Sequence, residues 1–259
     1  MEPLTGAGSP GRALLQPAGG PLLRGLEAAV QLFFPGRCRS CGRLVESPGL
    51  AVLCAECWEA LEGLPGPACP VCALPLARAG ADCPDCGRLH PAFDLALAPA
   101  PYRGRWRDLI HAYKFESKTS LRRPFCRLMA WKARGEGWSG HAGVVGVPVD
   151  RDRLKERGRD QGLELARGLA ARLGLPFIPG ALRKRPGLRR QSELGRAERL
   201  ENARGAFSAA LPARWRGGRL LLVDDILTTG ATAHSCALAL KAAGAKGVDV
   251  LVLARATLD

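Results

Sequence analysis

The sequence has no apolar run near the ~20 residues that a membrane-spanning helix requires. Its first 20 residues are rich in Gly and Pro and lack the apolar segment of a secretory signal peptide. We therefore expect residues 1–24 to form a flexible leader and the protein to be cytoplasmic, without a membrane span. The Gly-Lys-Ser/Thr sequence of a P-loop is also absent, which excludes that kind of nucleotide site.

Aromatic residues and acidic residues are both scarce. Aromatic side chains make up 5% of the chain, and Tyr102, Trp106 and Tyr113 fit a helical core pattern better than a stacking platform for single-stranded nucleic acid. The 24 acidic residues against 38 basic ones give a formal charge of +14. Part of this excess reflects a compositional preference for Arg. The remainder suits a polyanionic ligand, nucleic acid or both.

Large apolar residues are few between residues 38 and 86, so this segment cannot build much of a core. It contains four Cys-x-x-Cys pairs, a spacing that lets one tight turn aim two sulfur atoms at a tetrahedral zinc ion. In a cytosolic chain we expect metal ligands before disulfides. The pairs are Cys38/Cys41, Cys54/Cys57, Cys69/Cys72 and Cys83/Cys86.

We predict two structural four-cysteine zinc sites, formed by the first two pairs and by the last two pairs. An interleaved pairing stays open, as does one filled site beside a degenerate one, while redox disulfides are the least favoured alternative. Gly42 and Gly87 follow the first and last pairs in the position of a knuckle turn. Cys126 and Cys236 lie outside the array and fit a core role.

From residue 91 onwards, strand-like and helix-like segments alternate, which predicts an α/β domain with a twisted parallel sheet flanked by helices. A basic segment at 183–199 stands before the expected strand at 220–223, and it could close over a charged substrate or be an exposed basic loop. Before the cysteines, 26–34 could form a short helix. The expected strands are 93–100, 143–149, 175–181, 220–223 and 248–253, and the expected helices include 105–115, 121–133 and one ending at 243.

The stretch 219–233 organises the domain. An apolar run at 220–223 leads to Asp224 and Asp225, and a small hydroxyl-rich loop then opens a helix. Loop amides, Thr hydroxyls and the helix amino end suit a phosphate, while the two carboxylates suit the hydroxyl groups of a sugar or a metal ion. The loop residues are Thr228, Thr229, Gly230, Ala231 and Thr232.

This stretch resembles the phosphoribosyl pyrophosphate (PRPP) signature of type I phosphoribosyltransferases. The resemblance implies that Asp224 and Asp225 are the catalytic pair orienting the ribose hydroxyls, and that loop 228–232 holds the 5-phosphate. An ordinary strand, turn and helix with an acidic cap is the alternative. Arg153 and Arg157, on the loop after the strand at 143–149, are candidate cations for the pyrophosphate, unless that loop is a solvated basic turn.

Separated landmarks in a fixed order make the whole chain from about 32 to 255 resemble the ComF family. They include Leu-Phe-Phe-Pro at 32–35, Tyr-Arg-Gly at 102–104, Lys-Phe at 114–115, Arg-Gly-x-x-Gln at 157–161 and Gly-Ala-Phe at 205–207. Members combine a double zinc ribbon with a type I phosphoribosyltransferase fold. The implied division is a leader at 1–24, the double zinc ribbon at 25–90 and the phosphoribosyltransferase-like domain at 91–259.

Two departures from the family pattern affect the expected pyrophosphate side. Arg159-Asp160 stands where the family usually has Phe-Asn, and Leu188 replaces a common Thr. The resemblance nevertheless implies Mg²⁺ with PRPP, a role in DNA uptake, and single-stranded DNA and a competence helicase as partners. Two functions remain open: a phosphoribosyltransferase whose acceptor is not readable, and a non-catalytic PRPP-sensing protein that binds single-stranded DNA.

Overall fold

The computed structural model describes residues 36–38, 40–45, 53–115, 119–149, 154, 158–185 and 205–257. Several expectations fall outside these residues. They are the leader at 1–24, the helix at 26–34, Arg153, Arg157 and most of the basic segment at 183–199.

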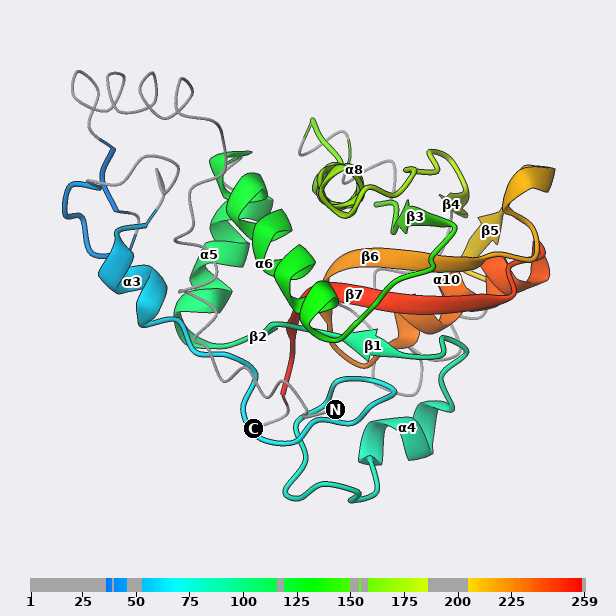
Figure 1. The fold of residues 1–259 in the computed structure, drawn as a ribbon, viewed down its shortest axis with the longest axis horizontal. Helices are drawn as coiled ribbons and strands as arrows, with labels where there is room; N and C mark the ends of the chain where they lie inside the picture. Colours follow the sequence, from blue (N-terminus) through cyan, green and yellow to red (C-terminus); the bar gives the residue numbers. More distant parts are fainter. Residues whose placement is uncertain are drawn as a thin grey trace.

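A five-stranded parallel sheet forms the centre of the fold, with strands in the order β1, β7, β6 and β3, and with β2 farther along the edge of β7. Figure 1 shows these strands one below the other, from β3 at the top to β1. The expected α/β class with a parallel sheet is confirmed. The strands are β1 (Ala96–Leu97), β2 (Ala100–Pro101), β3 (Gly143–Gly146), β6 (Arg219–Leu227) and β7 (Gly247–Arg255).

Helices cover both faces of the sheet, because both faces of its central strands are apolar. Leu221 and Val223 of β6 pack with α5, α6 and α8, whereas Leu220 and Leu222 pack on the side of α10 and the small antiparallel pair β4–β5. Alternate side chains of a strand point to opposite faces, so one apolar run supplies both cores. The bounds are α5 (Gly104–Phe115), α6 (Arg122–Gly135), α8 (Gln161–Leu173), α10 (Ala231–Ala242), β4 (Leu182–Lys184) and β5 (Phe207–Ala209).

Shorter elements complete the described chain. The 3-10 helices η1 (Thr119–Leu121) and η3 (Ala213–Trp215) precede α6 and β6, and the short helices α3 (Ala55–Glu59) and α4 (Pro84–Leu89) lie in the cysteine-rich segment. None of the helices in the described ranges is both long and apolar enough to cross a membrane.

Strand boundaries differ from the sequence-based expectations where proline interrupts the backbone ladder. The expected strand at 93–100 is two short strands on either side of Pro99, and β3 ends before Pro148, because proline has no N–H to donate. The strand expected at 175–181 is wrong: that segment forms a single bridge, Val144 to Phe177, and β4 follows it. By contrast, β6 runs on through Asp224 and Asp225 to Leu227.

The amino-terminal edge of the sheet is closed by a network of charged side chains. His141 Nε2 lies 2.9 Å from one oxygen of Asp249, and Arg219 donates to the other at 2.7 Å. Asp94 joins Arg219 to Lys241 of α10. Burial would raise the pKa of Asp249, but the hydrogen bonds from His141 and Arg219 hold this pKa below its ordinary value. Charges at this edge are therefore satisfied within the fold, and the carboxyl edge is the one left for a ligand.

Candidate functional site

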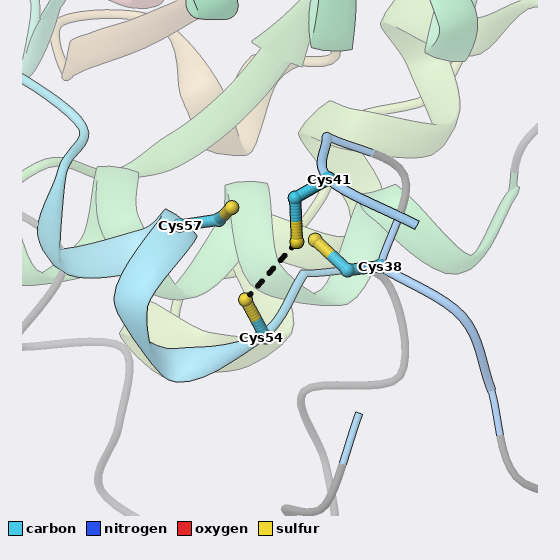
Figure 2. Close-up of side chains that lie close together, drawn as sticks. All are labelled: Cys38, Cys41, Cys54 and Cys57. Atoms are coloured by element: carbon cyan, nitrogen blue, oxygen red, sulfur yellow. Dashed lines mark hydrogen bonds between the residues drawn. The ribbon is translucent and has the colours of Figure 1, made fainter. Parts of the chain in front are cut away.

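The first two cysteine pairs converge on one point. Cys38 and Cys41 lie on a tight turn, Cys54 caps α3, and Cys57 lies within α3. Their four sulfur atoms all lie within 4.8 Å of one another (Figure 2), with Cys41 Sγ 3.7 Å from Cys54 Sγ.

The last two pairs form a second cluster of the same kind. Cys69 and Cys72 lie on a turn, Cys83 caps α4, and Cys86 lies within α4. The sulfur atoms of Cys69 and Cys86 are 3.7 Å apart, and those of Cys72 and Cys83 are 3.4 Å apart. The structure thus groups the pairs in sequential order and not in the interleaved order.

The two clusters are structural repeats of one another. Each turn is closed by an isolated antiparallel bridge, Arg37 to Leu44 in the first and Ala68 to Pro75 in the second. Gly42 has the left-handed backbone expected of a knuckle turn, with φ of 75°. The expectation for Gly87 is wrong, because this residue continues helix α4 and has no positive φ.

Both clusters fit a zinc ion. A tetrahedral ion with Zn–S distances of ~2.3 Å separates its sulfur ligands by about 3.8 Å, close to the observed spacings. All eight cysteines are free thiols. Burial raises the pKa of Cys57 to about 12 and that of Cys72 to about 11, so a cation is needed to make these groups thiolates near neutral pH.

The acidic pair lies at the carboxyl end of β6, in the middle of the sheet. Both side chains are half-buried, and Asp224 Oδ1 accepts a hydrogen bond of 2.8 Å from the amide of Asp225. Burial and then the charge of Asp225 raise the pKa of Asp224 to about 8. Asp224 therefore holds a proton more readily than an ordinary aspartate, and a cation at the site would favour its ionised form.

Two neighbouring elements bring further charges to this pair. Lys114, at the end of α5, lies 2.8 Å from Asp225 Oδ1. Asp160 caps α8 by accepting from the amide of Leu163, and its other oxygen accepts from the amide of Val149 after β3. Burial raises the pKa of Asp160, with a further contribution from Asp225. Because Asn can cap a helix in the same way, the departure at position 160 keeps this function. The described part of the site is net acidic around a single lysine.

The small loop that follows β6 presents backbone groups at the start of α10. Thr228 is exposed, and Thr229 and Thr232 are half-buried. The helix begins after Gly230, which has a φ of 82° and supplies no side-chain cap, and Thr229 Oγ1 accepts a long hydrogen bond of 3.4 Å from the amide of Ala231. An uncapped helix amino end favours an anion.

Sequence reasoning did not identify one residue at this edge, Arg255. It is 1% exposed at the end of β7, and its guanidinium donates to groups of the cysteine-rich segment and of the loop after β6. An arginine that ends a buried apolar strand is the only local signal. Arg153 and Arg157, predicted to bind the pyrophosphate, lie outside the described residues.

Comparison with known families and proteins agrees with this architecture. Residues 29–87 match the family model of the double zinc ribbon domain, in agreement with the two cysteine clusters. DNA utilization protein YhgH of Escherichia coli K12 is 28% identical over 228 residues, which cover 86% of this chain and 99% of that protein. Competence protein F of Haemophilus influenzae is 27% identical over 231 residues, which cover 86% of this chain and 99% of that protein.

Competence protein ComFC of Streptococcus pneumoniae is 29% identical over 216 residues, 78% of this chain and 87% of that protein. The resemblance to the ComF family is confirmed by these relatives together with the double zinc ribbon.

Solved structures give a more partial likeness. Glutamine PRPP amidotransferase from B. subtilis, complexed with ADP and GMP, has a TM-score of 0.38 and 22% identity, covering 55% of this chain and 30% of that one. Leishmania donovani UMP synthase has a TM-score of 0.31 and 16% identity, covering 57% of this chain and 24% of that one. The chain spans less than a third of either structure.

The two clusters predict a zinc content of two ions per chain. Cys41→Ser and Cys86→Ser should each reduce the content to one, because each removes a ligand from a different cluster. Metal analysis of purified protein measures this. Cys126→Ser, at a buried cysteine outside both clusters, is the matched control and should keep both ions. Loss of both ions in either ligand variant would contradict two independent centres.

Asp224→Asn should stabilise the protein above about pH 5, with a gain that grows until about pH 8. The pKa of Asp224 is about 8 in the folded state, against an ordinary value of 3.8 for the unfolded chain. Between these two pKa values the unfolded chain has released the proton and the folded state still holds it, so the free energy of unfolding falls as the pH rises. We expect a gain of about 1 kcal/mol or more at pH 8, or about 2–4 °C in melting temperature. Asp108→Asn, on the exposed face of α5, should give no such trend; a flat Asp224→Asn profile would contradict the raised pKa.

Proposed function

We propose that the carboxyl end of β6 binds PRPP, in a ComF-type role in DNA uptake and natural competence. The observation that supports this is the placement of Asp224 and Asp225 one short loop from the uncapped amino end of α10. A sugar phosphate satisfies both features, because its hydroxyl groups donate to carboxylates and its phosphate accepts from backbone amides. The names of the relatives, DNA utilization protein and Competence protein, support the cellular role.

In this proposal each part of the site contacts one part of the ligand. Asp224 and Asp225 accept from the ribose hydroxyl groups, and loop 228–232 surrounds the 5-phosphate. Mg²⁺ accompanies the pyrophosphate, with Arg153 and Arg157 as further cations on that side. Lys114 Nζ lies 2.8 Å from Asp225 Oδ1, so this ion pair holds one carboxylate in place before the ligand arrives.

Two activities use such a site. In a transferase, the bond from the ribose C1 to pyrophosphate breaks as an acceptor nucleophile bonds to C1, and the carboxylates stabilise the positive charge that develops on the ribose. In a sensing protein, PRPP binds without this step. The zinc centres are structural in both cases, because four sulfur ligands leave no open coordination position.

Asp225→Asn should weaken binding of Mg²⁺-PRPP by about 10- to 100-fold, since it removes the charge from a hydrogen-bond acceptor for the ribose. Isothermal titration of zinc-loaded protein measures this affinity. Asp108→Asn is the matched control, because it removes the same charge from an exposed position on α5. Equal affinities in the Asp225→Asn variant and the unaltered protein would rule out the proposed site.

Pyrophosphate release separates the two activities. Zinc-loaded protein is incubated with Mg²⁺-PRPP and either nucleobases or single-stranded DNA, with Asp225→Asn as the inactive control. Release that requires an acceptor identifies a transferase and its acceptor class. Binding without release identifies a sensing protein.

A second candidate function, binding of single-stranded DNA, is supported by an arginine surface on α6 and α8. These helices pack against each other and carry six arginines that have no carboxylate within ion-pair distance among the described residues. Burial and then the charge of Arg172 lower the pKa of Arg127. The surface consists of Arg122, Arg123, Arg127, Arg134, Arg167 and Arg172.

Such uncompensated cations suit the phosphates of a nucleic acid, which release counterions on binding. Arg123→Gln with Arg167→Gln should weaken binding of a fluorescent single-stranded oligonucleotide and lower the slope of log affinity against log salt by about 1.4. Arg78→Gln with Arg214→Gln is the control, because it removes two positive charges from exposed positions outside α6 and α8. Its salt slope should lie closer to that of the unaltered protein than the slope of Arg123→Gln with Arg167→Gln does. Equal slopes in the two double variants would exclude the arginine surface as the DNA site.

A further inference from the structure

Arg255 joins the second cysteine cluster to the loop after β6. On the side of the cluster, its Nε donates to the carbonyl of Cys72 at 2.9 Å, and its Nη2 lies 2.6 Å from Asp85 Oδ2. Cys72 is one of the four clustered cysteines, and Asp85 is a buried residue of α4 between two more. The guanidinium is thus held at the backbone and at the helix that form the metal centre.

On the side of the loop, the same guanidinium fixes two consecutive peptide groups. Its Nη1 donates to the carbonyls of Leu227 and Thr228, at 3.0 Å and 2.5 Å. The C=O and N–H of a trans peptide point in opposite directions. Arg255 holds both carbonyls inward, and the amide of Ala256 also donates to that of Leu227, so the amides of Thr228 and Thr229 are aimed away from Arg255. These are amides of the loop that we propose to bind phosphate.

Two further contacts support the loop from the same side. A Cβ placed on Gly230 would lie 2.9 Å from Cδ2 of Leu89, so α4 packs directly against the turn that starts α10. Just after α4, the amide of Ala92 donates to Nδ1 of His234 in α10 at 3.1 Å. Helix α4 and the segment just after it therefore contact the turn and the following helix.

The first cysteine cluster has a different environment. Cys38 and Cys57 pack in the hydrophobic core with α5 and α6, on the face of the sheet opposite α10. Beyond α3, the carbonyl of Glu62 accepts from Trp106 of α5. Among the described residues, no hydrogen bond joins this ribbon to residues 227–232. Within the described ranges, the second cluster is therefore connected to loop 228–232 and the first is not. Loss of the first cluster can serve as a control for loss of the second.

We propose that Arg255 is a positioning residue through which the second zinc centre holds the phosphate loop in its binding conformation. Zinc in this centre and a phosphate ligand on the loop then favour each other, because coupling between two sites is reciprocal. The ligand part of this inference rests on the proposed function. The positioning of loop amides by the second centre does not.

The first experiment measures the loop without any ligand. Hydrogen exchange of the amides at 227–233 is followed in the zinc-loaded protein, in Cys86→Ser and in Cys41→Ser. We expect exchange to be at least tenfold faster in Cys86→Ser and unchanged in Cys41→Ser, whereas the amides of β7 stay protected in both. Unchanged exchange at 227–233 in Cys86→Ser would overturn the proposal, whether or not PRPP binds.

Arg255→Lys tests the contribution of the guanidinium itself. Lysine keeps a positive charge near Asp85 but lacks the planar fork that contacts Cys72, Leu227 and Thr228 together. We expect faster exchange at 227–233 with the zinc content unchanged at two ions per chain. Wild-type exchange in this variant would show that Arg255 does not position the loop. Should Arg255→Lys fail to fold, the comparison of Cys86→Ser with Cys41→Ser still decides the proposal.

The second experiment measures the coupling as zinc release. In Cys41→Ser, which retains the second centre, zinc transfer to a chromogenic chelator is followed with and without Mg²⁺-PRPP. We expect PRPP to slow release by about 5-fold or more, and the effect to disappear when Arg255→Lys is added. Equal release rates with PRPP shown to be bound would overturn the coupling. Faster loop exchange in Cys86→Ser together with no PRPP binding would instead refute the proposed function and leave the positioning role intact.

Discussion

The structure places two adjacent, half-buried carboxylates at the carboxyl end of its central strand, where Lys114 is the one cation paired with them among the described residues. Asp225 has Lys114 as its ion-pair partner, while Asp224 shares a hydrogen bond with the next amide and keeps a raised pKa. A protein that needed only stability would not retain such a pair, because each carboxylate raises the cost of ionising the other. The uncapped start of α10 beside them supplies the complementary positive end. This arrangement is the basis on which we propose a ligand with both hydroxyl groups and a phosphate.

The cysteine-rich segment reaches this site by a different physical route. It has too few large apolar residues for a core of its own, so two sulfur clusters take the place of that core and attach to opposite faces of the sheet. The second cluster lies close to loop 228–232, and the buried Arg255 bonds to groups from both. The second cysteine cluster, which stabilises the cysteine-rich segment, is in this way also connected through Arg255 to loop 228–232, 140 or more residues later in the chain.

Features encoded by local motifs were readable from the sequence. The four cysteine pairs, the parallel sheet and the loop at 228–232 follow from short spacings and an apolar run, and the structure contains each of them. The sequential grouping of the pairs was the preferred prediction, and the structure decides it against the interleaved alternative. Features that depend on contacts distant in sequence were not readable: the partner of Asp225 comes from α5, and Arg255 contacts Asp85 across 170 residues. The error at Gly87 has a local cause, since a Cys-x-x-Cys pair fits both a turn and the start of a short helix. The roles of the site residues as ligands stay predictions.

A structure of the zinc-loaded protein with Mg²⁺-PRPP is the measurement that tests the central claim most directly. We predict the 5-phosphate against the amides of loop 228–232, the ribose hydroxyl groups on Asp224 and Asp225, and the carbonyls of Leu227 and Thr228 still bonded to Arg255. PRPP bound on the arginine surface of α6 and α8, or a phosphate turned away from α10, would contradict it.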